Sequence, residues 1–292
     1  YDPLTAANEP GLPAPVVSDV NNRPGRGSLA GLYERIMGDL QEASGLLPLE
    51  GASRNRPSKV AAEAMLARVA LGMGNYPLAL SQAEKVLATH SALIDFNTIR
   101  QGVSNPFPEA LPKGNVEMLF FSPKLSYVIL NTGIVAADPE LLSLFAPNDL
   151  RGKIYFYSIG GGLIYNRNYE GIAVDELYLI RAECLVRAGD VARGMQVLNS
   201  LLVKRYPTGN FVPLQAVGEL EALQMVISER RKELFGRGLR WQDLRRLNQD
   251  ARFAKTLRRS YDGVEYVLPP GDNRYTFPIP DDELAGNPIG QN

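Results

Sequence analysis

A glycine-rich segment near the middle of the chain combines aromatic rings with hydrogen-bonding side chains. The segment reads IYFYSIGGGLIYNRNYEG, and its candidate ligand-binding residues are Tyr155, Tyr157, Tyr165, Asn166, Arg167 and Tyr169. A tyrosine ring has a flat apolar face and a polar tip, which suits it to stack on a sugar ring. Amide and guanidinium groups can hydrogen-bond the sugar hydroxyls. From the residues alone, ordinary packing of the tyrosines in strands is the favoured interpretation, and a carbohydrate site is the alternative.

A second candidate is the strongly basic segment that contains the only tryptophan. Residues 227–259 hold eleven basic and four acidic side chains, which suits either an anion site or a set of ion pairs. Oppositely charged residues three positions apart can meet on a helix surface. The expected pairs are Glu229 with Lys232, Arg230 with Glu233, and Asp243 with Arg246. Trp241 shares a helix face with two leucines, so we expect it to point inward and anchor the core. The segment is then a structural clamp formed by Glu229, Arg230, Glu233, Arg240, Trp241 and Asp243.

Catalysis and metal binding have little support in the sequence. The adjacent carboxylates Asp281, Asp282 and Glu283 follow a proline, and capping of a helix is their expected role. A glycosidase needs two carboxylates that face each other across a cleft, about 5–10 Å apart. With one histidine and one cysteine, the chain can form neither a histidine-rich metal centre nor a multi-cysteine site. We predict no catalytic residue, no metal and no cofactor.

The overall charge limits the partners. The 31 basic and 32 acidic residues nearly cancel, which argues against general binding of nucleic acid or of an anionic membrane surface. No run of 18 apolar residues is present, so no transmembrane helix is expected. The sequence starts without an initiator methionine, a signal segment or a nearby cysteine, so we expect a mature or truncated chain.

Helical periodicity is strongest in two regions of the chain. Ser28 can cap a first amphipathic helix, and residues 58–90 then predict two helices separated by Gly74 and Asn75. Residues 175–206 predict a similar pair when Gly189 and Asp190 are aligned with that turn. Two helices joined in this way are typical of tetratricopeptide-type units.

The rest of the chain is expected to be less regular. Residues 91–174 lose the helical period and predict short strands, with one short helix opened by Asp138. We predict a mainly α fold, with tetratricopeptide-like helical hairpins and a loop-rich side that carries short strands, in a single domain of residues 1–292. Its expected parts are a first hairpin region (28–90), a loop-rich insertion (91–174), a second hairpin (175–206), and C-terminal helices with an extended tail (207–292).

Five segments carry a resemblance to a known family. They read LYERIMGDLQEASGLLP, RPSKVAAEAMLARVALGMGNYPLALSQAEKVL, DELYLIRAECLVRAGD, ISERRKELFGRGLRWQDLRR and YTFPIPDDELAGNPIGQN. In this order they resemble the SusD/RagB family of glycan-binding surface lipoproteins of the Bacteroidota outer membrane. The resemblance implies an α-helical fold with tetratricopeptide-like units and an irregular, loop-rich side.

The same resemblance implies a function. Such proteins capture oligo- or polysaccharide at the cell surface without catalysis and cap a SusC-like TonB-dependent transporter. An outer-membrane location is implied, with a lipid anchor on an N-terminal part ahead of this chain, since the family is usually longer. Family glycan-binding residues lie in variable loops, so the resemblance assigns none of the numbered residues.

Two other functions remain open from the sequence. A tetratricopeptide-type scaffold for a peptide or protein would be favoured by a long groove on the helical side. A glycoside hydrolase would require two facing carboxylates in a cleft.

Overall fold

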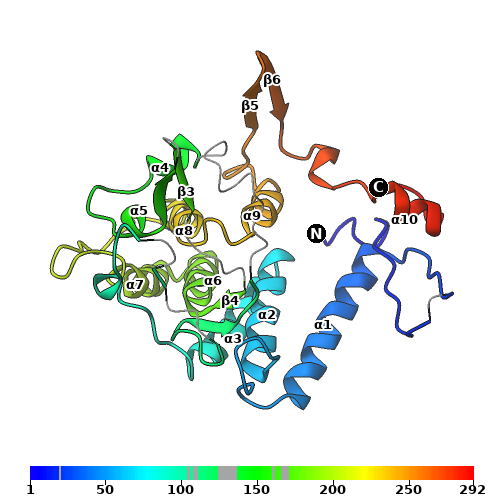
Figure 1. The fold of residues 1–292 in the computed structure, drawn as a ribbon, viewed down its shortest axis with the longest axis horizontal. Helices are drawn as coiled ribbons and strands as arrows, with labels where there is room; N and C mark the ends of the chain where they lie inside the picture. Colours follow the sequence, from blue (N-terminus) through cyan, green and yellow to red (C-terminus); the bar gives the residue numbers. More distant parts are fainter. Residues whose placement is uncertain (20, 104–105, 108–110, 124–136, 160–161, 166–170) are drawn as a thin grey trace. The chain divides into compact units, whose positions relative to one another are not determined.

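The computed structural model describes the chain apart from residues 20, 104–105, 108–110, 124–136, 160–161 and 166–170, and describes only the backbone of residues 157–159 and 162–165. Helices dominate this part of the chain, which confirms the mainly α prediction (Figure 1). The α-helices are α1 (Leu29–Leu46), α2 (Lys59–Gly72), α3 (Tyr76–Leu87), α4 (Pro139–Leu142), α5 (Arg151–Ile154), α6 (Val174–Arg187), α7 (Val191–Leu202), α8 (Glu219–Glu233), α9 (Arg240–Leu247) and α10 (Asp281–Gly286). The 3-10 helices are η1 (Phe96–Thr98) and η3 (Asn273–Tyr275).

Short strands pair in the described part of the chain as antiparallel ribbons. The strands are β1 (Met118–Phe120), β2 (Phe156–Ile159), β3 (Gly162–Tyr165), β4 (Ile172–Ala173), β5 (Leu257–Tyr261) and β6 (Val264–Leu268). β1 pairs with β4, β2 with β3, and β5 with β6. The chain divides into two compact units: a smaller unit of residues 1–39, 72–74 and 241–292, and a larger unit of residues 40–71 and 75–240.

Two helical hairpins of equal size form the frame of the larger unit. α2 and α6 have 14 residues each, and α3 and α7 have 12 each. In both hairpins a glycine with positive φ, Gly74 or Gly189, follows the first helix. The next residue, Asn75 or Asp190, accepts a hydrogen bond from the backbone N–H three positions further on, at 3.2 and 3.1 Å. The alignment of the two predicted hairpins is therefore confirmed.

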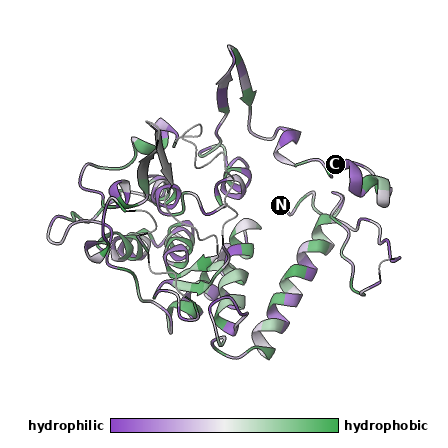
Figure 2. Ribbon diagram, in the orientation of Figure 1, coloured by the Kyte–Doolittle hydropathy of each residue, from purple (hydrophilic) through white to green (hydrophobic). Residues whose placement is uncertain are grey.

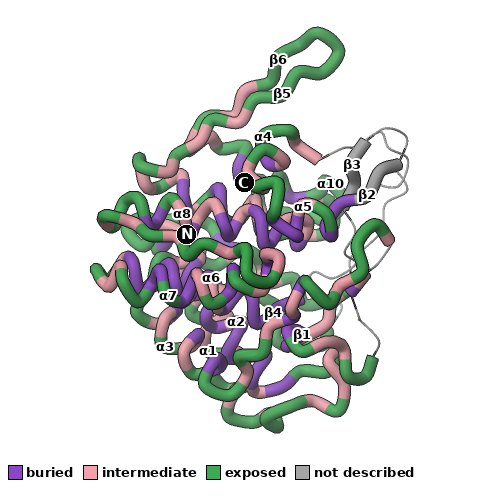
Figure 3. The backbone as a smooth tube through the Cα atoms, turned by 90° about the vertical axis from the view of Figure 1, so that its left-hand side faces the viewer, coloured by how far each residue is buried: buried purple, intermediate pink, exposed green. Residues whose placement is uncertain are grey.

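Small residues let the helices of the larger unit approach closely. α6 packs against α3, α7 and α8, and Figure 3 shows it as largely buried. The core that α2, α3 and α6 share includes Ala64, Ala67, Ala79, Ala83, Leu177, Ile180 and Cys184. Since alanine has a short side chain that loses no rotamer freedom, these positions favour both helix formation and close packing.

The first predicted helix is also present. The Ser28 hydroxyl accepts a hydrogen bond from the Gly31 N–H at 3.1 Å, as an N-cap does. Polar and apolar residues alternate along α1, as Figure 2 shows. None of its residues is buried, so the apolar stripe predicted for this helix is only half-buried.

The two chain ends lie together in the smaller unit. Arg26 donates hydrogen bonds to the carbonyl oxygen of Gly11 and to the side chain of Asn292, both at 2.6 Å. The Gln291 amide binds both backbone groups of Ile279, at 2.6 and 2.9 Å. α10 begins directly after Pro280 and carries three acidic residues in its first turn. Their negative charges interact favourably with the positive N-terminal end of the helix dipole.

The contact between α6 and α7 can be tested at Gly194. A Cβ at this position would collide with the Val186 side chain and would lie 3.0 Å from the carbonyl oxygen of Ala182. We expect Gly194→Ala to lower the free energy of unfolding by about 1–3 kcal/mol in urea denaturation, because the helices cannot separate without loss of packing. The matched control is Gly38→Ala in α1, where a Cβ meets nothing within 4 Å. This substitution should stabilise the helix by about 0.5–1 kcal/mol, because alanine favours a helix more than glycine does. Equal effects of the two substitutions would contradict the packing.

Candidate ligand-binding site

The tyrosine-containing segment begins with a β-hairpin. β2 and β3 are antiparallel, with Phe156 opposite Tyr165 and Tyr157 opposite Ile164. The backbone therefore places two of the predicted ligand-binding tyrosines on one ribbon. The other predicted residues that follow the hairpin, Asn166, Arg167 and Tyr169, lie outside the described residues.

Tyr155 lies in the core and not at a surface. Its side chain is fully buried, at 0% exposure, and its ring packs against Phe96 and Phe107 with centroid distances of 5.8 and 6.1 Å. The next residue, Phe156, packs against Phe145 at 5.6 Å. A ring enclosed in this way has no face left for a ligand. Tyr155 therefore cannot stack on a sugar ring, the role that the sequence suggested for it. Its contacts instead anchor the start of the β2–β3 hairpin.

A buried network of charged side chains adjoins this aromatic cluster. Arg151 opens α5 and is fully buried, at 0% exposure. Its guanidinium donates hydrogen bonds to Asp149 at 2.7 Å, to Glu229 at 2.7 Å and to Glu233 at 3.0 Å. Lys232 adds ion pairs with Asp149 at 3.3 Å and with Glu229 at 2.6 Å. These bonds fix α5, and hence the start of the hairpin, on α8.

Arg205 extends the network to the end of α7. It is also fully buried and donates to Glu233 at 2.8 Å and to Glu117 at 2.6 Å. A third bond runs to the carbonyl oxygen of Ile94 at 2.7 Å, and the guanidinium lies 4.1 Å from the centre of the Phe96 ring. Arg205 therefore joins α8 to Ile94, shortly before η1, and to Glu117, directly before β1. It also supports the Phe96 ring, against which Tyr155 packs.

The pairing within the network favours the charged forms of Arg151 and Asp149. Burial alone would lower the pKa of Arg151, but the Glu229 and Asp149 carboxylates outweigh it and raise that pKa well above its usual value. Burial alone would raise the pKa of Asp149, but Arg151 and Lys232 outweigh it and lower that pKa. The pKa of Tyr206 is raised to about 12 by burial and by the carboxylates of Asp149 and Glu229.

A second buried cluster holds the far end of the candidate segment. The carbonyl oxygen of Gly171 accepts hydrogen bonds from Arg237 at 2.8 Å and from Arg68 at 3.3 Å. Arg237 also binds both oxygens of Asp175, at 2.8 and 2.9 Å, and Arg68 binds Glu176 at 2.6 Å. Apart from Tyr155, the predicted ligand-binding residues therefore lie in the sequence between two structural anchors, the Tyr155 cluster and the Gly171 carbonyl.

The basic segment forms ion pairs, as the sequence suggested. Two expected pairs form: Glu229 with Lys232 at 2.6 Å and Asp243 with Arg246 at 2.8 Å. Glu233 is the acceptor of the two buried arginines described above, and Arg230 lies 3.8 Å from Glu176 of α6. The acidic and basic residues of α8 thus tie it to α5, α6 and the end of α7. Sequence spacing indicated none of these three connections.

Trp241 is half-buried and is not a core residue. Its indole N–H donates to the carbonyl oxygen of Tyr275 at 3.1 Å. Its ring stacks on Phe277, with centroids 5.3 Å apart and planes 10° apart. Arg240, directly before it, is also half-buried. Trp241 therefore anchors the extended tail within the smaller unit.

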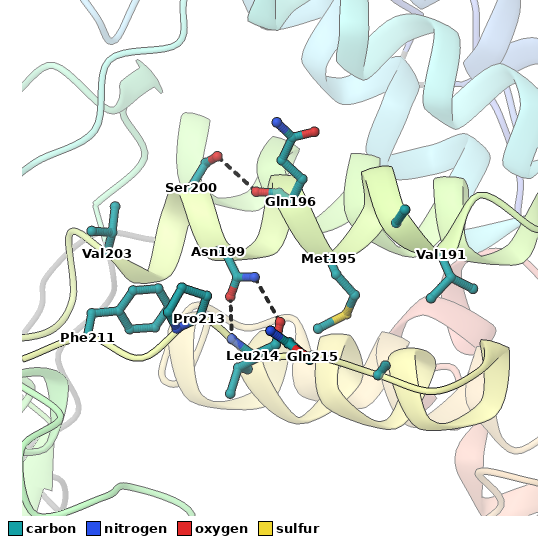
Figure 4. A pocket seen from close by; sticks show the side chains of 12 residues that line it. Val191, Met195, Gln196, Asn199, Ser200, Val203, Phe211, Pro213, Leu214 and Gln215 are labelled. Atoms are coloured by element: carbon teal, nitrogen blue, oxygen red, sulfur yellow. Dashed lines mark hydrogen bonds between the residues drawn. The ribbon is translucent and has the colours of Figure 1, made fainter.

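A groove along α7 is a second candidate site (Figure 4). It has a volume of about 700 Å³, and none of its twelve lining residues is charged. Figure 4 shows Met195 and Asn199 of α7 directed toward the extended segment 211–216, which contributes Phe211. The Asn199 amide holds this segment through the N–H and the carbonyl oxygen of Leu214, both at 2.9 Å. The sequence identified the segment only as a loop, since no local pattern indicates this contact.

The described residues contain neither a cluster of side chains suited to a metal ion nor a helix suited to span a membrane. No group of three or more histidine, cysteine, aspartate or glutamate side chains in this part of the chain is arranged to hold a metal ion. No helix in the same residues is long and apolar enough to cross a membrane.

Comparison with sequence models of protein families decides the family. Residues 174–291 match the SusD family, and residues 4–71 match a family described as "Starch-binding associating with outer membrane". The chain is a SusD-like protein. The resemblance expected from the five sequence segments is therefore confirmed. No curated protein sequence matches the chain.

Solved structures share the fold of this SusD-like protein. A SusD superfamily protein from Bacteroides thetaiotaomicron is 21% identical, with a TM-score of 0.74 over 98% of this chain and 71% of its own. A SusD superfamily protein from Bacteroides fragilis is 21% identical, with a TM-score of 0.72 over 95% of this chain and 68% of its own. A SusD-like carbohydrate binding protein from Bacteroides vulgatus is 18% identical, with a TM-score of 0.66 over 91% of this chain and 66% of its own. This chain thus spans about two thirds of such proteins, and at these identities the likeness shows the fold alone.

The buried network predicts a specific response to acid. Because the pKa of Asp149 is lowered from 3.8 in the folded protein, its stabilising effect is fully present above about pH 4 and is lost as the pH falls through the folded pKa. We expect Asp149→Asn to lower the free energy of unfolding at pH 7 by about 1–3 kcal/mol. The difference from the original chain should shrink below pH 4 in urea titrations at several pH values. A difference that stays constant down to pH 2 would contradict the ionised pair.

Proposed function

We propose that this SusD-like protein is a nonenzymatic cell-surface subunit that binds oligo- or polysaccharide. The observation that carries the proposal is the match of residues 4–71 to a family described as starch-binding and associated with the outer membrane. The match of residues 174–291 to the SusD family supports it in a second part of the chain. The chemistry of the tyrosine-containing segment is consistent with this ligand, since it combines ring faces with amide and guanidinium donors.

Within this proposal the ligand is bound by Tyr157, Tyr165, Asn166, Arg167 and Tyr169. Support comes from the way the segment is held. Its first residues continue from the buried Tyr155 cluster, and the Gly171 carbonyl that follows it is bound by two arginines. Fixing the ends of a binding segment lowers the conformational entropy that ligand binding costs, which favours affinity.

The further steps of the proposal concern delivery. The bound glycan passes to a SusC-like TonB-dependent transporter at the outer membrane, and the full-length protein stays at the cell surface through a lipid anchor. The association of the second matched family with the outer membrane supports this location. The test is whether a TonB-dependent transporter co-purifies with the protein from outer membranes, and its absence would contradict delivery.

A tetratricopeptide-type protein scaffold is the second candidate function, and the uncharged groove on α7 favours it. Its apolar walls suit a peptide segment, whereas a sugar would need more polar partners. For a glycoside hydrolase, the third possibility from the sequence, the α7 groove has no carboxylate among its lining residues. Measured turnover of a glycan would establish such an activity.

The glycan-binding proposal is tested with the double variant Tyr165→Ala/Tyr169→Ala. The original chain is first screened on a glycan array, and the best ligand is then titrated by calorimetry. Loss of two stacking rings should weaken binding by at least about tenfold. The matched control is Gln196→Ala, an exposed residue that lines the α7 groove, and it should bind as the original chain does.

Two results would contradict the proposal. If no arrayed glycan binds, the chain does not bind carbohydrate by itself. If a glycan binds and only Gln196→Ala weakens it, the ligand occupies the α7 groove and the assigned residues are wrong. Equal melting temperatures of the variants would show that neither substitution acts by unfolding the chain.

A further inference from the structure

The β5–β6 hairpin of the smaller unit presents side chains that the proposed site does not use. In Figure 1 it projects beyond the end of α9 as a two-stranded arm. Asp262 and Gly263 form its turn, with φ values of 48° and 73°. Positive φ at both central residues is the requirement of a type I′ turn, whose twist matches that of the two strands. The turn therefore fixes the register in which Tyr261 lies opposite Val264.

This register gives the hairpin two different faces. Residues directly opposite each other point to the same side of an antiparallel ribbon, and successive residues alternate. One face carries Leu257, Arg259, Tyr261, Val264, Tyr266 and Leu268, and the other carries Arg258, Ser260, Glu265 and Val267. On the second face Arg258 and Glu265 form an ion pair at 3.0 Å. The first face, called here the tyrosine face, is mostly apolar.

The tyrosine face is open to solvent at its outer end. Tyr261 is 76% exposed, Tyr266 55% and Val264 51%. Tyr261 and Tyr266 are diagonal neighbours across the ribbon, and such neighbours are about 7–8 Å apart. Three adjacent large side chains are thus exposed together, and the two tyrosine rings among them are open to stacking by a ligand.

The base of the hairpin is braced, which keeps this face in place. Arg274 donates to the carbonyl oxygen of Val267 at 2.9 Å. The same guanidinium binds both oxygens of Asp272, at 2.8 and 2.7 Å. These hydrogen bonds from Arg274 lower the pKa of Asp272 to about 2, so the carboxylate is charged and the brace is intact at neutral pH. An isolated two-stranded hairpin is only marginally stable in water. The hydrogen bond from Arg274, which lies outside the two strands, adds a contact that stabilises the end of β6.

The size of the tyrosine face selects the kind of ligand. Five residues of strand extend about 17 Å, and each of the two strands occupies a width of about 5 Å, so the footprint is roughly 170 Å². A stable protein interface needs about 800 Å² on each partner. The face is thus too small to hold a second protein or a second copy of this chain by itself. A short oligosaccharide needs only flat aromatic faces with polar tips at its sides, and two exposed tyrosines supply both.

We propose that the tyrosine face of the β5–β6 hairpin is a second carbohydrate-binding surface. Tyr261 and Tyr266 stack on different pyranose rings of one glycan chain, and their hydroxyls bond to its hydroxyl groups. This inference rests on the proposed function for the class of ligand, but it uses different residues. Two separate surfaces on one chain would hold a long polysaccharide more tightly than either surface alone, because the second contact becomes intramolecular.

The test is affinity gel electrophoresis of the chain in gels that contain soluble starch, dextran, xylan or galactomannan. The double variant Tyr261→Ala/Tyr266→Ala is compared with Ser260→Ala, an exposed residue on the opposite face of β5. With a polysaccharide that retards the original chain, we expect the double variant to have a dissociation constant raised by about fivefold or more. Ser260→Ala should migrate as the original chain does. Tyr261→Phe/Tyr266→Phe keeps the ring faces and should retain most of the binding.

Each other result overturns the inference and is distinguishable from failure of the proposed function. If the double variant binds as tightly as the original chain, the hairpin is not a glycan surface, while the proposed function stands. If the original chain is retarded by none of the four polysaccharides, the second surface is overturned, while the glycan array separately decides the proposed function. If light scattering shows an oligomer that only the double variant loses, with unchanged glycan binding, the face is a contact between copies. Circular dichroism of the variants excludes misfolding as the cause.

Discussion

Two buried arginines, Arg151 and Arg205, provide the constraint on which the larger unit depends. Both donate to Glu233, so this one carboxylate joins α5, the end of α7 and α8. A charge taken out of water is very unfavourable unless it is paired and hydrogen-bonded. Removal of one member of the network therefore leaves its partners uncompensated. Since α5 leads directly into Tyr155 and the β2–β3 hairpin, the network also decides where the candidate ligand-binding segment begins.

The arrangement separates the frame of this SusD-like protein from the part that would recognise a ligand. The frame is made of paired helices and buried ion pairs, and each helix depends on its neighbours. The tyrosine-containing segment is joined to it through the aromatic cluster at one end and the Gly171 carbonyl at the other. Residues between two such anchors can change without disturbing the helices. Loops on a rigid scaffold commonly carry binding residues for this reason.

The helical frame could be predicted from the sequence because its signals are local. Gly74 with Asn75, and Gly189 with Asp190, show in two adjacent residues where a helix ends and the next begins. The buried network could not be predicted, since Arg151 and Glu233 are 82 positions apart and helix spacing rules reach only three or four. Nor could the burial of Tyr155, since it depends on the rings of Phe96 and Phe107, which lie far from it in the sequence. The ligand-binding roles of Asn166, Arg167 and Tyr169 stay predictions, because these residues lie outside the described part of the chain.

The central claim is that a ligand is bound by the segment held between the Tyr155 cluster and Gly171. Hydrogen–deuterium exchange of the chain, with and without a glycan selected on an array, tests it most directly. The account predicts slower exchange of backbone amides in residues 156–171 when the glycan is added, with little change in α6 and α8. Slower exchange confined to residues 191–216, around the α7 groove, would contradict it.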